Sequence, residues 1–221
     1  MERNDEVIRC DVVEALSRDS RLNRARITVA VDQGRTMLRG DAPTLYTIHA
    51  AMELAACVPG VRSVHSELGV SRPAVSPSDT AIRRYAEQVL RWNVSTGAGR
   101  IGVRVDAGML TLEGEVDAYW KRSRAELLML DIEGIVGVVN RLVVVPELTP
   151  QDDVIAEDVK SAIERCTCAG RAGITVEVRE GLVTLTGSVP SLWSKQNTPH
   201  LAESILGVTG VIDKLVVAAQ D

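Results

Sequence analysis

The chain has 221 residues, a net charge of −5 and 25% charged side chains, which is typical of a globular protein in water. Aromatic residues make up only 3% and Phe is absent, so we expect cores of Val, Leu, Ile and Ala in place of an aromatic-lined ligand cavity. No stretch reaches the roughly 18 apolar residues of a membrane-spanning helix, and no apolar run follows the acidic first residues. These features predict a cytoplasmic protein, at most peripheral to the inner membrane.

A threefold internal repeat dominates the sequence, with offsets of 74 and then 73 residues. Apolar positions follow these offsets, as at Leu38, Leu112 and Leu185. Nine glycines follow them as well, and we interpret them as structural turn residues. They are Gly34, Gly108 and Gly181, then Gly40, Gly114 and Gly187, then Gly60, Gly134 and Gly207. The repeat predicts three domains, over residues 5–72, 78–147 and 151–219.

Each copy is predicted to begin with an amphipathic helix. In the second copy, Asp79 fits as the helix N-cap, and Ile82, Ala86 and Leu90 form an apolar stripe at helical spacing. The same helix carries Arg83 and Arg84, which we expect to be solvated. It also carries Trp92, which has no counterpart in the other copies and which we expect to pack against the domain.

Two strands and a second helix are predicted to follow. Residues 101–105 and 110–114 alternate apolar with polar or small side chains, and a short join ending in Gly108 predicts a hairpin. A second helix then ends at Gly134, and the last strand spans 138–144. Each copy is therefore predicted as an α-β-β-α-β unit.

The predicted fold class is α+β, with three tandem small two-layer domains. Each has a three-stranded mixed sheet covered on one face by two helices. Residues 71–78 and 146–151 each contain two Pro, so we expect semi-rigid spacers and copies that behave as separate tethered units.

The repeat resembles the BON domain, named after bacterial OsmY and nodulation proteins. The matching stretches are Leu38-Arg-Gly-Asp, Val58-Pro-Gly-Val, Gly114-Glu-Val, Ile132-Glu-Gly-Ile-Val-Gly-Val and Leu185-Thr-Gly-Ser-Val. The resemblance implies non-enzymatic modules associated with phospholipid binding, envelope integrity, osmotic stress or attachment to larger assemblies. Many relatives are exported, and this sequence departs from them because no export signal is visible. Pro199 is a second departure: it predicts a second helix in copy three that either starts late or is kinked.

One aromatic position recurs at the start of the second helix, as Tyr46, Trp120 and Trp193. In copy two, cations follow the ring at Lys121, Arg122 and Arg124. Interfacial aromatics beside cations favour anionic phospholipid headgroups, so these six residues are the candidate contacts for lipid or a partner. The alternative is that the rings cover the cores and the charges are solvated.

The net charge of each copy does not favour an anionic partner, and only the local group of cations in the second copy does. Residues 5–72, 79–147 and 151–221 carry net charges of 0, −1 and −4. A charge of this sign disfavours a nucleic-acid partner.

No catalytic residue, cofactor or metal site is predicted. His49, His65 and His200 do not share a repeat position, and no phosphate-binding glycine motif is present. The four cysteines are expected to be reduced, with Cys10 and Cys57 buried as small apolar residues. Cys166 and Cys168 are expected to be loop residues without a metal, since a zinc site needs about four ligands.

The sequence therefore predicts a non-enzymatic binding module at a phospholipid surface. Two alternatives stay open: a protein-interaction scaffold or homo-oligomer, and a cytoplasmic ion or small-ligand sensor.

Overall fold

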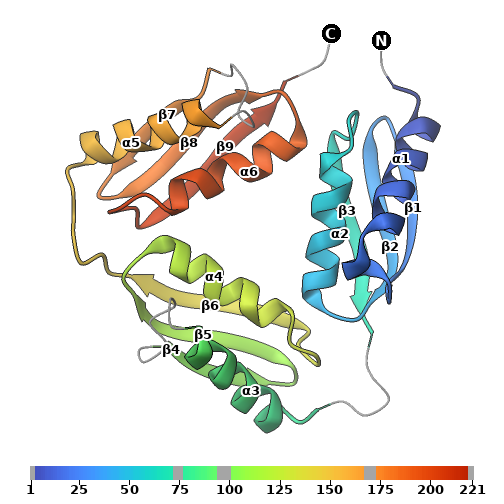
Figure 1. The fold of residues 1–221 in the computed structure, drawn as a ribbon, viewed down its shortest axis with the longest axis horizontal. Coiled ribbons are helices and arrows are strands. Elements are labelled where there is room, and N and C mark those ends of the chain that lie inside the picture. Colours follow the sequence, from blue (N-terminus) through green and yellow to red (C-terminus); the bar gives the residue numbers. More distant parts are fainter. Residues whose placement is uncertain (1–2, 72–76, 94–100, 167–172, 219–221) are drawn as a thin grey trace.

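A computed structural model describes residues 3–71, 77–93, 101–166 and 173–218 of the chain. It consists of three consecutive α-β-β-α-β copies (Figure 1). The elements of copy one are α1 Asp5–Arg18, the short 3₁₀ turn η1 Ser20–Leu22, β1 Arg26–Asp32, β2 Arg35–Ala42, α2 Leu45–Cys57 and β3 Ser63–Val70. Copy two contains α3 Asp79–Trp92, β4 Ile101–Asp106, β5 Met109–Val116, α4 Tyr119–Leu130 and β6 Gly137–Val144. Copy three contains α5 Asp152–Arg165, β7 Thr175–Arg179, β8 Leu182–Val189, α6 Leu192–Glu203 and β9 Gly210–Val217.

Each sheet is mixed, as the sequence predicted. In copy two, β4 pairs antiparallel with β5, and β6 pairs with β5 in parallel. The return from β5 to β6 runs through α4, which is the crossover that a parallel neighbour requires. The other two sheets repeat this order and these directions.

The core of each copy lies between its sheet and its two helices. In copy two, Leu110 and Leu112 of β5 are fully buried against Ala86 and Leu90 of α3 and Met129 of α4. Alternate β5 residues point inward because side chains on a strand alternate between the two sheet faces. This explains the spacing of the apolar repeat in the sequence.

The first helix of each copy begins with an N-cap residue and then an aspartate, and the N-cap side chain bonds to the helix in copies one and two, at Asn4 and Ser78. In copy two the N-cap is Ser78, whose hydroxyl accepts the Ala81 N–H, so the assignment of Asp79 as N-cap was wrong by one residue. Asp79 instead accepts the backbone N–H groups of Ala107 and Gly108, at 2.8 and 3.0 Å. Asp5 and Asp152 bind the β1–β2 and β7–β8 turns in the same way. The aspartate therefore fixes the hairpin turn to the first helix in all three copies.

The nine repeat glycines all have positive φ. Gly108 shows why a side chain is excluded at the hairpin: its φ is +78°, and an added Cβ would lie 2.7 Å from the Gly134 carbonyl oxygen. Because Gly134 itself follows α4, this contact joins the hairpin to the end of the second helix.

Pro199 lies inside α6, which runs without interruption from Leu192 to Glu203. The alternative of a helix starting near Thr198 is therefore wrong. Directly before the proline, the Thr198 hydroxyl donates to the Ser194 carbonyl at 2.7 Å. Proline has no N–H to donate to the Lys195 carbonyl, and the Thr198 bond ties the helix to its preceding turn beside that gap.

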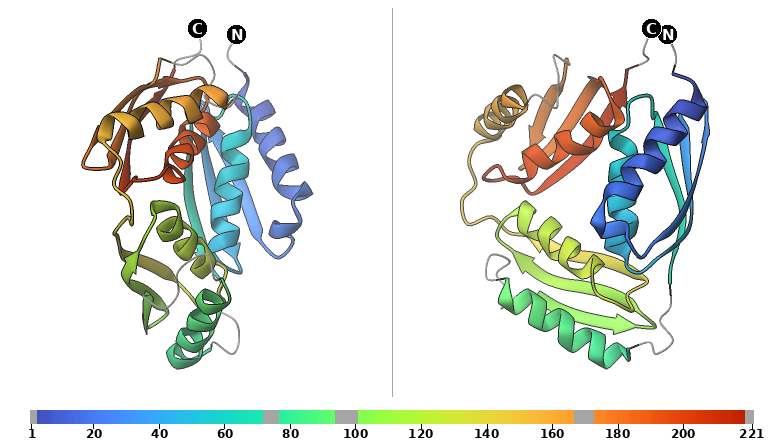
Figure 2. Two further views of the ribbon diagram at one scale, coloured as in Figure 1. Left: turned by 60° about the vertical axis from the view of Figure 1, so that its left-hand side comes forward. Right: turned by 45° about the vertical axis from the view of Figure 1, so that its right-hand side comes forward.

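The three copies pack against one another in a closed cycle, which contradicts the expectation of separate tethered units. The first residue of each second helix inserts beside the core of another copy: Leu45 beside copy two, Tyr119 beside copy three and Leu192 beside copy one. Helices α2, α4 and α6 contact one another pairwise and lie toward the centre of the molecule (Figures 1 and 2). The three inserted residues share one repeat position, so the cycle follows from the repeat itself.

The cysteines differ from their predicted environments. Cys10 and Cys57 are exposed free thiols, so their predicted burial is wrong. Partial desolvation and the neighbouring carboxylate of Glu53 raise the pKa of Cys57 above its usual value. Cys166 is disulfide-bonded, contrary to the expectation of reduced cysteines, and Cys168 lies outside the described residues.

Candidate functional site

The predicted contact residues lie on three different helices, one in each copy. Tyr46, Trp120 and Trp193 are the second residues of α2, α4 and α6. Tyr46 and Trp120 are half-buried, whereas Trp193 is 38% exposed. The rings thus lie next to the residues that join the copies, at Leu45, Tyr119 and Leu192.

The cations beside Trp120 already have partners within copy two. The Lys121 ammonium pairs with the Asp117 carboxylate at 2.7 Å and lies 5.6 Å from the centre of the Trp120 ring. Arg122 donates to the carbonyl oxygens of Leu142 and Asn140, at 3.2 and 3.3 Å. The Arg122 bonds fix α4 to β6, which leaves Arg124 as the exposed cation of the predicted set.

Tyr46 is engaged in a similar way within copy one. Hydrogen bonds that Arg21 donates to Asp19 and to Tyr46 raise the pKa of Arg21 above its usual value, with the larger effect from Asp19. Arg21 lies in the 3₁₀ turn after α1, so this contact joins that turn to the start of α2. The Tyr46 hydroxyl therefore has a structural partner.

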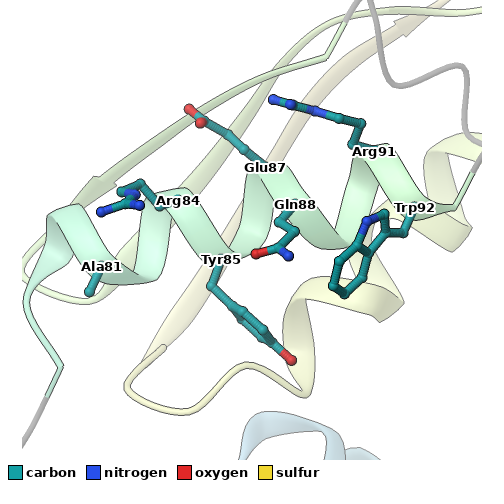
Figure 3. Close-up of a pocket in the computed structure, with 7 residues that line it drawn as sticks. All are labelled: Ala81, Arg84, Tyr85, Glu87, Gln88, Arg91 and Trp92. Atoms are coloured by element: carbon teal, nitrogen blue, oxygen red, sulfur yellow. The ribbon is translucent and has the colours of Figure 1, made fainter.

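An exposed aromatic face lies elsewhere in copy two, on the outer side of α3. Trp92 is 71% exposed and Tyr85 is 53% exposed, so the expectation that Trp92 packs against the domain is wrong. Figure 3 shows both rings pointing to the same side of the helix, with Gln88 between them. Together with Ala81, Arg84, Glu87 and Arg91 they line an open surface hollow of about 540 Å³.

This face is specific to the second copy. The positions of Tyr85 and Trp92 are held by Asp11 and Arg18 in α1, and by Asp158 and Arg165 in α5. The net charges of the three first helices also set α3 apart. Helix α3 carries three arginines against two carboxylates, α1 two arginines against four, and α5 one lysine and one arginine against five. Helix α3 is therefore the cationic one of the three, with a charge of +1.

We call Ala81, Arg84, Tyr85, Gln88, Arg91 and Trp92 the α3 outer face. Two of its members are cations, and Figure 3 places Arg84 and Arg91 on the flank of the helix above the two rings. Glu87 lies on the same flank and forms an ion pair with Arg83 at 4.0 Å. The helix thus presents two large amphipathic rings with arginines alongside, a combination suited to an interface between water and an apolar phase.

The three histidines do not assemble into a site. His65 is exposed on β3, while His49 lies 3.8 Å from the Glu53 carboxylate on α2. The His200 ring lies 3.0 Å from Glu203, which raises its pKa, with a smaller contribution from Glu53 of copy one. Within residues 3–71, 77–93, 101–166 and 173–218, no group of three metal-binding side chains occurs.

The described helices include none that is long and apolar enough to cross a bilayer. The structure is that of a tandem-repeat α+β protein. Its three copies have equivalent buried cores, and they differ in the side chains that they expose to solvent.

The chain belongs to the BON domain family, whose model matches residues 4–72, 78–146 and 151–219. Domains of this family are generally non-catalytic. The three matches account for nearly the whole chain and confirm the resemblance seen in the sequence.

Among curated proteins, the chain is similar to a 21 kDa hemolysin of Actinobacillus pleuropneumoniae. The two are 27% identical over 146 residues, covering 62% of this chain and 74% of the hemolysin.

Among solved structures, it is similar to the C-terminal domain of CdsD, a structural protein of the type III secretion system of Chlamydia trachomatis. That match has 14% identity and a TM-score of 0.27, and it covers 99% of this chain and 100% of that chain. A second CdsD structure has 15% identity and a TM-score of 0.26, covering 98% and 94%.

Proposed function

We propose that this protein is a non-enzymatic binding module that attaches to an anionic phospholipid surface through the α3 outer face. The observation that carries the proposal is the exposure of Trp92 and Tyr85 on one side of a cationic helix, at positions that are polar in the other two copies. Contiguous exposed apolar surface rimmed by polar residues marks protein or membrane interaction sites.

The proposed contact combines two forces. Burial of one large aromatic side chain is worth roughly 1.5–3 kcal/mol, so moving the two rings into the interface gives several kcal/mol before entropic losses. Each arginine near an anionic bilayer adds about 1 kcal/mol, which Arg84 and Arg91 can both supply. Because the whole chain is negative, binding depends on this local arrangement and falls as salt screens it.

The proposal relocates the predicted contact within copy two. Trp120, Lys121 and Arg122 remain candidates. The Trp120 ring, the Lys121 ammonium and the Arg122 guanidinium, however, already have partners inside the domain. The family membership and the name of the hemolysin relative both support a role at membranes. We extend the proposal to a cytoplasmic protein at the inner membrane, with a role in envelope or osmotic stress.

Vesicle flotation of the full chain tests the proposal. We expect binding to vesicles containing phosphatidylglycerol, weak binding to phosphatidylcholine vesicles, and a loss of at least about tenfold in affinity for Tyr85→Ala/Trp92→Ala. The matched control is Asp11→Ala/Arg18→Ala, which alters the same repeat positions in α1 and should float like the parent. Trp120→Ala should also float like the parent. If Trp120→Ala abolishes flotation and the α3 double variant does not, the contact lies at α4 and the α3 assignment is wrong.

The ion or small-ligand alternative stays a prediction. A thermal-shift series with K⁺, Ca²⁺ and Zn²⁺ tests it, since a ligand of the folded state raises the melting temperature.

A further inference from the structure

The outer faces of the sheets carry a second difference between the copies. Helices cover one face of each sheet, and the other face is turned to solvent. In copy two this face exposes Met109, Val139 and Val143 by 43%, 37% and 58%. In copy three the same repeat positions are Leu182, Ile212 and Val216, exposed by 40%, 39% and 58%. We call each of these sets of three residues an apolar stripe, so copies two and three present equivalent stripes.

Strand pairing places each stripe on two neighbouring strands. Val139 lies beside Thr111 of β5, and Ile212 beside Thr184 of β8. The strand begins with a glycine in both copies: the side chain of Met109 occupies the space over Gly137, and that of Leu182 the space over Gly210. The stripes therefore match in residue type, register and local packing.

Copy one lacks this stripe. Its equivalent positions are Arg35, His65 and Gly69. The face is crossed by an ion pair between Arg39 and Glu67, whose Nε and Oε2 atoms are 2.7 Å apart. A stripe that is apolar in two copies and polar in the third is not required by the fold.

We propose that the stripes of copies two and three form the interface of a symmetric dimer, in which the copy-two sheet of each chain packs on the copy-three sheet of its partner. Two sheets pack face to face at about 10 Å through such apolar faces. A twofold axis makes the two contacts equivalent, which is the commonest symmetry of oligomers.

The net charges of the two sheet faces identify a second molecule of this chain as the partner that covers the stripes. On the outward strand positions, copy two carries Arg104 and Arg141 against Asp106, Glu113 and Glu115, for a net charge of −1. Copy three carries Arg179 and Lys214 against Glu177, for a net charge of +1. The two faces of one chain are thus complementary to each other in charge and alike in their apolar stripe.

A stable dimer needs the area of both sheet faces. Three strands about 4.8 Å apart, with about 3.3 Å per residue, give each face roughly 300 Å². Specific dimers need about 600 Å² from each partner. One stripe alone falls short, whereas the two together reach the lower limit.

Sedimentation velocity of the full chain over a range of concentrations tests the proposal. We expect a monomer–dimer equilibrium, and we expect Val139→Lys and Ile212→Lys each to raise the dimer dissociation constant by at least about tenfold. The matched control is His65→Lys, which places the same side chain at the same repeat position of copy one and should leave the dissociation constant unchanged. Tyr85→Ala/Trp92→Ala should also leave it unchanged, so the dimer and the membrane contact are tested separately.

Melting curves establish that the variants are folded. Val139→Ser and Ile212→Ser provide milder changes that should weaken the dimer less than lysine does. A chain that stays monomeric at every concentration contradicts the proposal, as does a dimer that both lysine variants leave intact. If Val139→Lys reduces vesicle flotation of a monomeric chain, the stripe contacts lipid and the dimer interface is overturned.

Discussion

The first helices of copies two and one have the same interior and opposite exteriors. Helix α3 buries Ile82, Ala86 and Leu90, and α1 buries Ile8, Val12 and Leu16 at the same repeat positions. Outside, α3 carries Tyr85 and Trp92 where α1 carries Asp11 and Arg18. Residues that the fold needs thus recur, and residues that differ between copies are free to serve binding. The comparison predicts that inner changes reduce stability and outer changes reduce binding.

The largest expected effect comes from the shared interior. Leu112→Ala should lower the free energy of unfolding by about 3 kcal/mol, because Leu112 is fully buried and alanine leaves a cavity. Leu38→Ala and Leu185→Ala remove the equivalent leucines, which are also fully buried, and should have similar effects. Urea denaturation measures all three. A much smaller loss in one copy would show that the interiors are not equivalent.

A smaller effect is expected at the aspartate of the hairpin turn. Asp79→Ala should lower the free energy of unfolding by about 2 kcal/mol, because it leaves the N–H groups of Ala107 and Gly108 without their acceptor. Asp79→Asn retains one acceptor oxygen and should lose less. If alanine and asparagine have equal effects, the charge of the carboxylate and not its geometry stabilises the turn.

The outer face of α3 should be nearly neutral for stability. Tyr85→Asp/Trp92→Arg, which gives α3 the residues of the other first helices, should change the free energy of unfolding by less than about 0.5 kcal/mol. The same variant should lose vesicle binding, and because the added Asp and Arg cancel in charge, the loss reports on the rings and not on the net charge. A loss of stability comparable to that of Asp79→Ala would mean that the rings support the fold.

The smallest expected effect is a pH dependence at the contact between copies one and three. The hydrogen bond to Glu203 raises the folded-state pKa of His200, and Glu53 of α2 adds to it. A raised pKa means that this stabilisation is complete below the unfolded-state pKa of about 6.5 and is lost as the pH rises through the folded value. The effect is small because the ring is 59% exposed.

Thermal melting between pH 5 and pH 8 measures this dependence. His200→Gln should flatten the pH profile of the melting temperature, and Glu53→Gln should flatten it in part. A profile that is identical in the parent chain and in His200→Gln would show that this histidine does not titrate with unfolding.

The sequence predicted the interior of each copy better than its surface. The glycine and apolar repeats were enough to predict the elements and the mixed sheet, since both depend on local periodicity. Two side chains that were wrongly expected to be buried share one cause. Trp92 follows the buried Leu90 by two positions, and Cys10 follows the buried Ile8 by two, which turns each about 200° around the helix toward solvent.

The contacts between copies could not be predicted from periodicity. Leu45, Tyr119 and Leu192 are apolar residues at a repeated helix start, and nothing local indicates which neighbouring core receives them. The proline-containing linkers suggested separation, whereas burial of these three residues favours a closed cycle. The α3 outer face was overlooked for a related reason: Trp92 was seen to have no counterpart in the other copies, but it was still assigned to packing and not to a surface.

Trp92 fluorescence gives the most direct test of the proposed membrane contact. In a chain carrying Trp120→Phe and Trp193→Phe, Trp92 is the only remaining tryptophan, and its ring should emit as a solvent-exposed indole. Addition of phosphatidylglycerol vesicles should shift the emission to shorter wavelength as the ring leaves water. Emission that stays unchanged while the chain floats with the vesicles would contradict the assignment of the α3 outer face.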